Sequence, residues 1–396
     1  MTKKDYLCQK HCSRPAMKTA FRLAVVTALL VCALPSLRAQ EEGFFRRLNR
    51  KLTTPSRVYD TSYVYQLDLP GVVSPAADLI WTGINLHRDV SIQKAGEEEE
   101  LYFIENHLSR ELFEKAGVGI SYGTLAFNYT FELNRHDTRR NKYYNFSFIR
   151  PRFAVNFRYY HIHEYLAGTL VPVDTPSASV DFTSQDPGQM RHVVIDGIFF
   201  FNPEHFSYLA TTGRNVVQRR SAGSWLATAC YSQGEYKYDK SDEVVQEFPD
   251  HIGRLQTGAF SFGGGYSFNW VPYHRAPHGD SVRGFRNLTI NATLMPRISL
   301  YDHVLVTQYK DPAKSREWEV SKDHNFFLPA LHLSAHAGFI YSWSRYFICA
   351  TADFERYGFR KLKTVSHEAS DGRNYKTLTR GSFYSITTRI QFNVRF

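Results

Sequence analysis

The residues best suited to chemistry lie near the carboxyl end of the chain. His332, Ser334 and His336 alternate with apolar residues, and Asp353 occupies a similar position in the next such segment. Side chains two residues apart point to the same face of a β-strand. A histidine base, an acid that orients it and a serine nucleophile are the groups of a serine hydrolase. These four residues are therefore the candidate catalytic set.

The same residues also fit a structural role. A polar side chain removed from water needs a hydrogen-bond partner, and the lumen of a barrel is lined with such side chains. We favour this second interpretation and expect no catalytic residue. His161 and His163, like His332 and His336, have the spacing of a metal pair, but no three-ligand zinc pattern is present. We therefore expect no metal and no cofactor.

Three further motifs have weaker chemical interpretations. Residues 119–123 (GISYG) match the GxSxG pattern, but a nucleophile elbow requires a helix next, and residues 124–133 read as a continuing strand. Residues 218–221 (QRRS) could grip a phosphate or a lipid headgroup, although a basic cluster at a membrane interface is the interpretation we favour. Residues 263–265 (GGG) precede no helix and predict a bend in a strand.

The last fifteen residues predict the kind of element that positions these groups. In SFYSITTRIQFNVRF the apolar and polar side chains alternate, so one face of a strand suits hydrocarbon and the other suits water. A closed barrel in lipid pairs every strand and leaves no exposed edge. We expect this closing strand to face lipid through Tyr384, Ile386, Ile390, Phe392, Val394 and Phe396.

The amino-terminal residues predict export. Leu23–Leu34 is a short apolar run after Lys18 and Arg22, too short to span a bilayer as a helix, and Ala39 suits a signal-peptidase site. We assign residues 1–39 to a Sec signal peptide, with the true start at Met1 or Met17. Residues 40–57 are then a periplasmic lead-in, and residues 58–396 form the barrel.

Composition agrees with this division. The whole chain has a formal charge of +10, but seven of its 48 basic residues and one of its 38 acidic residues lie in residues 1–39. The rest carries only +4, so we expect no nucleic-acid partner. Cys230 and Cys349 remain after cleavage, too few for a disulfide framework, and read as small strand residues. The 25 Tyr and 30 Phe suit the aromatic girdles of a membrane barrel.

Strand-like segments recur along the chain and set the size of the barrel. They are residues 58–67, 78–93, 101–107, 117–133, 144–160, 192–202, 217–236, 255–270, 287–301, 331–341, 345–357 and 382–396. An even strand number with both ends in the periplasm fits twelve, with ten as the alternative. The prediction is an all-β, transmembrane, antiparallel up-and-down barrel. A tight turn at residues 342–344 falls on the periplasmic side, and longer connectors fall outside.

Several stretches also resemble a known family. They are YDTSYVYQ from Tyr59, GVGISYGTLAFNYTFELN from Gly117, FSYLATTGRNVVQRRSAGSWL from Phe206, GGGYSFNWVP from Gly263 and the closing strand. In these the chain resembles the Bacteroidetes family called domain of unknown function 4421. The resemblance implies an outer-membrane barrel of a Gram-negative anaerobe. It implies no activity and no catalytic residues.

The expected function is therefore a non-enzymatic one in the outer membrane. A barrel of this size can serve envelope structure or form a narrow or plugged pore. One alternative is a barrel hydrolase acting on lipid or peptide through His332, Ser334, His336 and Asp353. A second alternative is a surface adhesin or receptor. The expected partners are outer-membrane lipids and the barrel assembly machinery, which would engage the closing strand.

Overall fold

The structure is a computed structural model. It describes residues 50, 52, 57–94, 98–108, 113–133, 141–164, 166–174, 179–183, 188–212, 214–238, 251–276, 284–309, 318–326, 330–360, 365–368 and 373–396. The expected signal peptide and most of the lead-in lie outside these residues. Within the part of the chain that the structure describes, no helix is long and apolar enough to cross a membrane.

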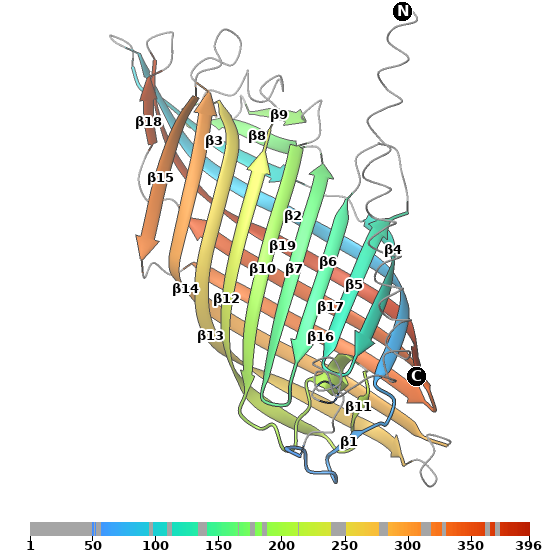
Figure 1. The fold of residues 1–396 in the computed structure, drawn as a ribbon. Helices are drawn as coiled ribbons and strands as arrows, with labels where there is room; N and C mark the ends of the chain where they lie inside the picture. The colour runs from blue at the N-terminus through green and yellow to red at the C-terminus, as the bar shows by residue number, and fades with distance from the viewer. Residues whose placement is uncertain are drawn as a thin grey trace, which may run out of the picture. The chain divides into compact units, whose positions relative to one another are not determined.

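Twelve antiparallel strands close into a ring (Figure 1). Each pairs with its neighbour in sequence order, and the last pairs with the first, through Arg395 opposite Val72. The expected all-β, up-and-down barrel of twelve strands is thus confirmed. The strands of the wall are β2 (Gly71–Lys94), β4 (Phe113–Tyr122), β5 (Leu125–Glu132), β6 (Lys142–Ile149), β7 (Phe153–Glu164), β10 (Gly188–Phe200), β12 (Ala222–Lys237), β13 (Ile252–Arg275), β14 (Arg286–Tyr309), β16 (Leu331–Trp343), β17 (Tyr346–Arg360) and β19 (Arg373–Arg395).

Shorter strands extend the wall at one end of the barrel only. They are β3 (Glu100–Leu108), β8 (Leu166–Pro172), β9 (Val180–Thr183), β15 (Trp318–Phe326) and β18 (Val365–Glu368), all at the upper end in Figure 1. The opposite end, where β2 begins and β19 ends, is called the terminal end below. A hairpin turn at Ser344 and Arg345 lies there, as expected. Extensions at one end and a tight turn at the other give the asymmetry of this barrel class.

Two of the segments expected in the wall lie outside it, and two other segments each contain two wall strands instead of one. The total is therefore still twelve. Residues 58–67 contain only β1 (Val64–Gln66), which pairs with β11 (Val216–Gln218) outside the wall, and residues 101–107 belong to β3. Residues 117–133 and 144–160 each form a hairpin of two wall strands. Gly123 turns the first hairpin with a φ of 56°, a conformation that suits glycine. A strand follows this turn, so residues 119–123 form no strand-to-helix elbow.

The two faces of the wall differ as the alternation of the closing strand predicts. Ile390, Phe392 and Phe396 are exposed on the outside of β19, while Ser385 and Asn393 are buried on the inside. Tyr384, Ile386 and Val394 share the outer face and are partly exposed. Large apolar side chains are exposed on the outer face of most other wall strands too. This outer surface suits hydrocarbon and would be unfavourable in water.

The connection between β10 and β12 folds into the barrel at the terminal end. It contains β11 and a short 3-10 helix, η3 (Leu209–Thr212), which contacts β14 and β16. Residues 57–70 lie against it through the pairing of β1 with β11 (Figure 1). We call these two segments, residues 57–70 and residues 201–212 with 214–221, the plug.

Candidate functional site

Three of the candidate residues lie on the inner face of β16, opposite polar or aromatic residues of β17. His332 faces Tyr357, Ser334 faces Glu355, and His336 faces Asp353 in the ladder register. Leu331 lies on the outer face of the same strand and is exposed. Regular alternation along two paired strands therefore brings the four candidates into one row inside the barrel.

His336 and Asp353 form a direct pair. Nδ1 of His336 lies 2.7 Å from a carboxylate oxygen of Asp353, so the ring donates this hydrogen bond. Nε2 on the other side of the ring is buried and has no hydrogen-bond partner among the described residues. An acid and a histidine that it orients in this way are two of the three members of a catalytic triad.

Ser334 and His332 are held by other groups. The Ser334 hydroxyl accepts a hydrogen bond of 3.0 Å from Arg297. His332 lies 3.0 Å from the Ser261 hydroxyl through Nδ1 and 3.0 Å from the carbonyl of Gly358 through Nε2. Because a carbonyl only accepts, Nε2 carries the proton and Nδ1 accepts from Ser261. The structure thus brings His336 and Asp353 together, whereas Ser334 and His332 are hydrogen-bonded to other residues.

A buried charge network crosses the lumen beside this row. Arg158 of β7 forms ion pairs with Asp196 of β10 and with Glu355 of β17, on the facing wall. Arg297 of β14 also pairs with Asp196, at 3.0 Å, and is fully buried. Tyr160 donates a hydrogen bond of 3.1 Å to Glu355. Sequence reasoning missed this network, although charged residues at inward positions in mid-strand were a signal for it.

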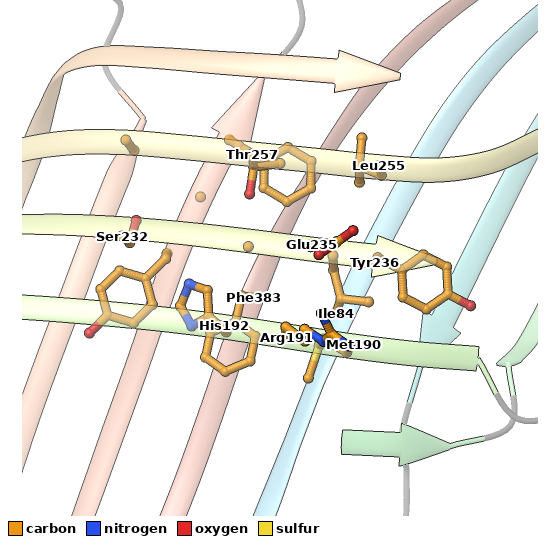
Figure 2. Close-up of a pocket in the computed structure, with 15 residues that line it drawn as sticks. Ile84, Met190, Arg191, His192, Ser232, Glu235, Tyr236, Leu255, Thr257 and Phe383 are labelled. Atoms are coloured by element: carbon orange, nitrogen blue, oxygen red, sulfur yellow. The ribbon is translucent and has the colours of Figure 1, made fainter. Parts of the chain in front are cut away.

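An apolar layer fills the barrel beyond the network. Its members come from most of the wall and include Ile84, Val194, Leu255 and Phe383. The His192 ring lies on that of Phe383, with centroids 3.8 Å apart. Figure 2 shows the small cavity in this layer, which measures about 20 Å³ and has room for about one water molecule. A cavity of this size is too small for a solute larger than water.

The plug is tied to the wall by buried hydrogen bonds. The side-chain amide of Asn269 donates to the backbone carbonyl of Ser207 at 3.0 Å, and that of Asn287 donates to the carbonyl of Gln218 at 3.0 Å. Gln218 is fully buried. Arg219 donates to the carbonyl of Thr61 at 2.8 Å. The basic cluster expected at a membrane interface thus joins the two segments of the plug.

Burial shifts the pKa of two groups in the plug. Burial raises the pKa of Tyr59 to about 12, partly offset by a hydrogen bond to the Ser207 hydroxyl at 3.2 Å. Burial also lowers the pKa of Arg214 to about 10. The Arg214 guanidinium donates to the carbonyl of Thr124 at 3.3 Å. In both cases removal from water disfavours the charged form of the side chain, which is the phenolate for Tyr59 and the guanidinium for Arg214.

A polar cavity of about 150 Å³ lies between the plug and one side of the wall. It extends from Val72 and Phe347 at the terminal end to Arg158 farther inside, and His336 and Asp353 line it. The apolar side chains of the plug pack on the other side of the lumen, against residues of β7, β10, β12 and β14. The cavity therefore holds the one histidine–acid pair of the candidate set.

The remaining sequence motifs make contacts that fit a structural role. His161 and His163 both approach the side chain of Gln189, and the described residues contain no group of three or more His, Cys, Asp and Glu placed to hold a metal. Cys230 and Cys349 are free and buried. Residues 263–265 lie within β13 and continue its pairing with β12.

The chain is similar to several solved protein structures. Two similar solved structures are the outer membrane protease OmpT from Escherichia coli and the toluene transporter TodX from Pseudomonas putida. OmpT is 9% identical, with a TM-score of 0.37, and the match covers 82% of this chain and 97% of OmpT. TodX is 8% identical, with a TM-score of 0.20, and the match covers 83% of this chain and 90% of TodX. No curated protein matches the chain.

The barrel fold follows from the strand pairing alone, and the family to which the chain belongs follows from a match to a family model. The model described as a domain of unknown function, DUF4421, matches residues 104–375, which is more than half of the chain. This match confirms the family that the sequence motifs resemble. The chain belongs to the DUF4421 family.

Proposed function

We propose that the protein is a closed, non-enzymatic barrel of the outer membrane that serves the structure of the envelope. The observation that carries this proposal is the filled lumen. The plug occupies the terminal end, the network of Arg158, Asp196 and Glu355 crosses the middle, and the apolar layer around Phe383 follows. Three successive layers of described residues support a lumen without a continuous water path, in contrast to an open porin.

Placement in the outer membrane rests on the outer surface of the wall. Exposed aromatic and aliphatic side chains surround it, among them Trp81, Phe153, Trp270 and Phe339. In hydrocarbon a closed ring leaves no unpaired backbone group, and in water this surface would promote aggregation. Export by the Sec pathway, lipid contact and assembly through the closing strand by the barrel assembly machinery belong to the same proposal.

Conductance in planar bilayers tests closure. Purified, heat-modifiable protein should insert without stable conductance steps. In a first variant, a short glycine–serine linker replaces residues 203–219 and so removes most of the plug. The apolar layer remains in this variant, so it should pass small currents only if that layer also loosens. A second variant adds Phe383→Ala to open that layer. Regular conductance steps from the wild type would refute the closed barrel.

The hydrolase is kept as a second candidate because of one observation. Asp353 orients His336, which lines a polar cavity and whose Nε2 is buried without a partner among the described residues. This pair could act as a base on a substrate that brings its own hydroxyl or water. Lipase and protease assays on the wild type and on His336→Ala test it. Turnover that vanishes in His336→Ala but persists in Ser334→Ala would replace the structural role with an enzymatic one.

A further inference from the structure

We propose that the polar cavity beside the plug binds a small hydroxylated carboxylate solute. Arg214 would pair with the carboxylate, and Nε2 of His336 would form a hydrogen bond with the hydroxyl group. Both residues line the cavity, from the plug and from the wall respectively. This inference goes beyond the closed barrel, because a barrel that conducts nothing can still hold a solute in a side chamber.

The size and lining of the cavity define the class of ligand. Its volume of about 150 Å³ is similar to that of a protein cavity that binds benzene. The largest solute that fits therefore has roughly six to ten heavy atoms. An apolar guest would leave the amide and hydroxyl groups of the lining without partners. These groups include the side chains of Asn128, Asn156, Thr351 and Gln391.

Charge balance selects an anionic group. Two other arginines that line the cavity are matched by acids, since Arg158 pairs with Asp196 and Glu355, and Arg389 pairs with Asp78 at 2.6 Å. Arg214 is buried, and among the described residues no carboxylate pairs with it.

A buried guanidinium without an acid is costly, and a carboxylate is its best bidentate partner. Among the described residues, the Arg214 side chain makes one hydrogen bond, of 3.3 Å, to the backbone carbonyl of Thr124. Its remaining donors can therefore serve a ligand. The cavity also contains the carboxylate of Asp353, but this group is held by His336 on the wall, whereas Arg214 lies on the plug.

The state of His336 selects the second group of the ligand. Nδ1 donates to Asp353, and Nε2 on the other side of the ring is buried without a partner in the described structure. A hydroxyl group on the solute can donate to Nε2 of the neutral ring or accept from Nε2 of the protonated ring. A small solute with both a carboxylate and a hydroxyl group therefore matches the two groups that the described residues leave unpaired.

Lactate and lactamide provide a matched pair of probes. They have the same shape and the same hydroxyl, and they differ in charge. Isothermal titration of the folded full-length protein in detergent, at neutral pH and moderate salt, should show saturable binding of lactate. Lactamide should bind at least roughly tenfold more weakly, because hydrogen bonds to charged groups are about twice as strong as neutral ones.

Three variants assign the binding to the proposed residues. Arg214→Gln should weaken lactate binding roughly ten- to a hundredfold, whereas Arg152→Gln, which changes an exposed arginine of the turn after β6 that does not line the cavity, should leave it unchanged. His336→Gln leaves the contacts of Arg214 intact and should weaken binding by about tenfold. Hydrogen exchange of the plug amides in each variant separates loss of binding from loss of the plug.

Several results would overturn the proposal. These are no saturable lactate binding by folded wild type, equal affinity for lactamide, or undiminished lactate binding by Arg214→Gln. Undiminished binding by His336→Gln would overturn the assignment of the hydroxyl group. None of these results bears on closure, which conductance measures separately.

Discussion

The guanidinium Nε of Arg395 donates a hydrogen bond of 2.8 Å to the backbone carbonyl of Arg214. The last residue of the closing strand is thereby tied to the plug, although 181 positions separate the two in sequence. Arg395 is buried and lies over the Phe347 ring, 4.2 Å from its centroid. The Arg395 side chain therefore ties the end of β19 to the plug.

Arg395→Met should loosen the plug while the wall remains closed. The substitution keeps an apolar side chain on Phe347 but removes a charged donor, with an expected cost of about 1.5–3 kcal/mol. Hydrogen exchange should accelerate at amides of residues 206–221 and stay slow in the wall strands. Arg152→Met, at an exposed residue of the turn after β6, is the control. Equal exchange in both variants would show that Arg395 does not seat the plug.

Tyr59→Phe should change how stability responds to alkaline pH. Burial raises the pKa of Tyr59 from 10.0 to about 12, so the folded protein favours the neutral phenol. Its contribution is fully present below pH 10 and is lost as the pH rises through 12, by about 3 kcal/mol in all. Thermal midpoints at pH 8, 10 and 11.5 should fall more steeply for the wild type than for Tyr59→Phe. Parallel curves would contradict this burial.

Arg158→Ala should destabilise the barrel strongly. It would leave Asp196 and Glu355 buried without their shared partner, and breaking a buried ion pair from one side costs about 3–5 kcal/mol. Thermal unfolding, followed by heat-modifiable gel migration, measures the loss. Arg254→Ala removes a more exposed pair with Glu235 and should cost only about 0–1 kcal/mol. Similar midpoints for both variants would refute a structural role of the network.

Gly71→Val should impair closure of the barrel. Gly71 and Phe396 exchange two backbone hydrogen bonds, of 3.0 Å and 2.9 Å, and the Phe396 ring occupies the space that a side chain at position 71 would need. We expect a smaller heat-modifiable fraction after refolding into detergent. Pro75→Val, at an exposed position of the same strand, serves as the control. A normal folded fraction for Gly71→Val would show that the ring can move without loss of closure.

The sequence by itself determined the class of fold and the two faces of the wall. Alternation with period two is local, and the contrast between lipid and lumen makes it visible in residues 382–396. It therefore placed Ile390 and Phe392 outside and Asn393 inside without any knowledge of partners. The number of wall strands was also correct, although hairpins at Gly123 and near residue 150 were read as single strands.

The contents of the lumen were decided only by the tertiary structure. Alternation marks a residue as inward but does not say which of eleven other strands it meets, so Arg158 could not be matched with Glu355, nor Ser334 with Arg297. Two of the stretches that carry the family resemblance, around Tyr59 and Phe206, form the plug. Their pairing joins segments about 150 residues apart. Such contacts depend on closure of the ring, which no local pattern encodes.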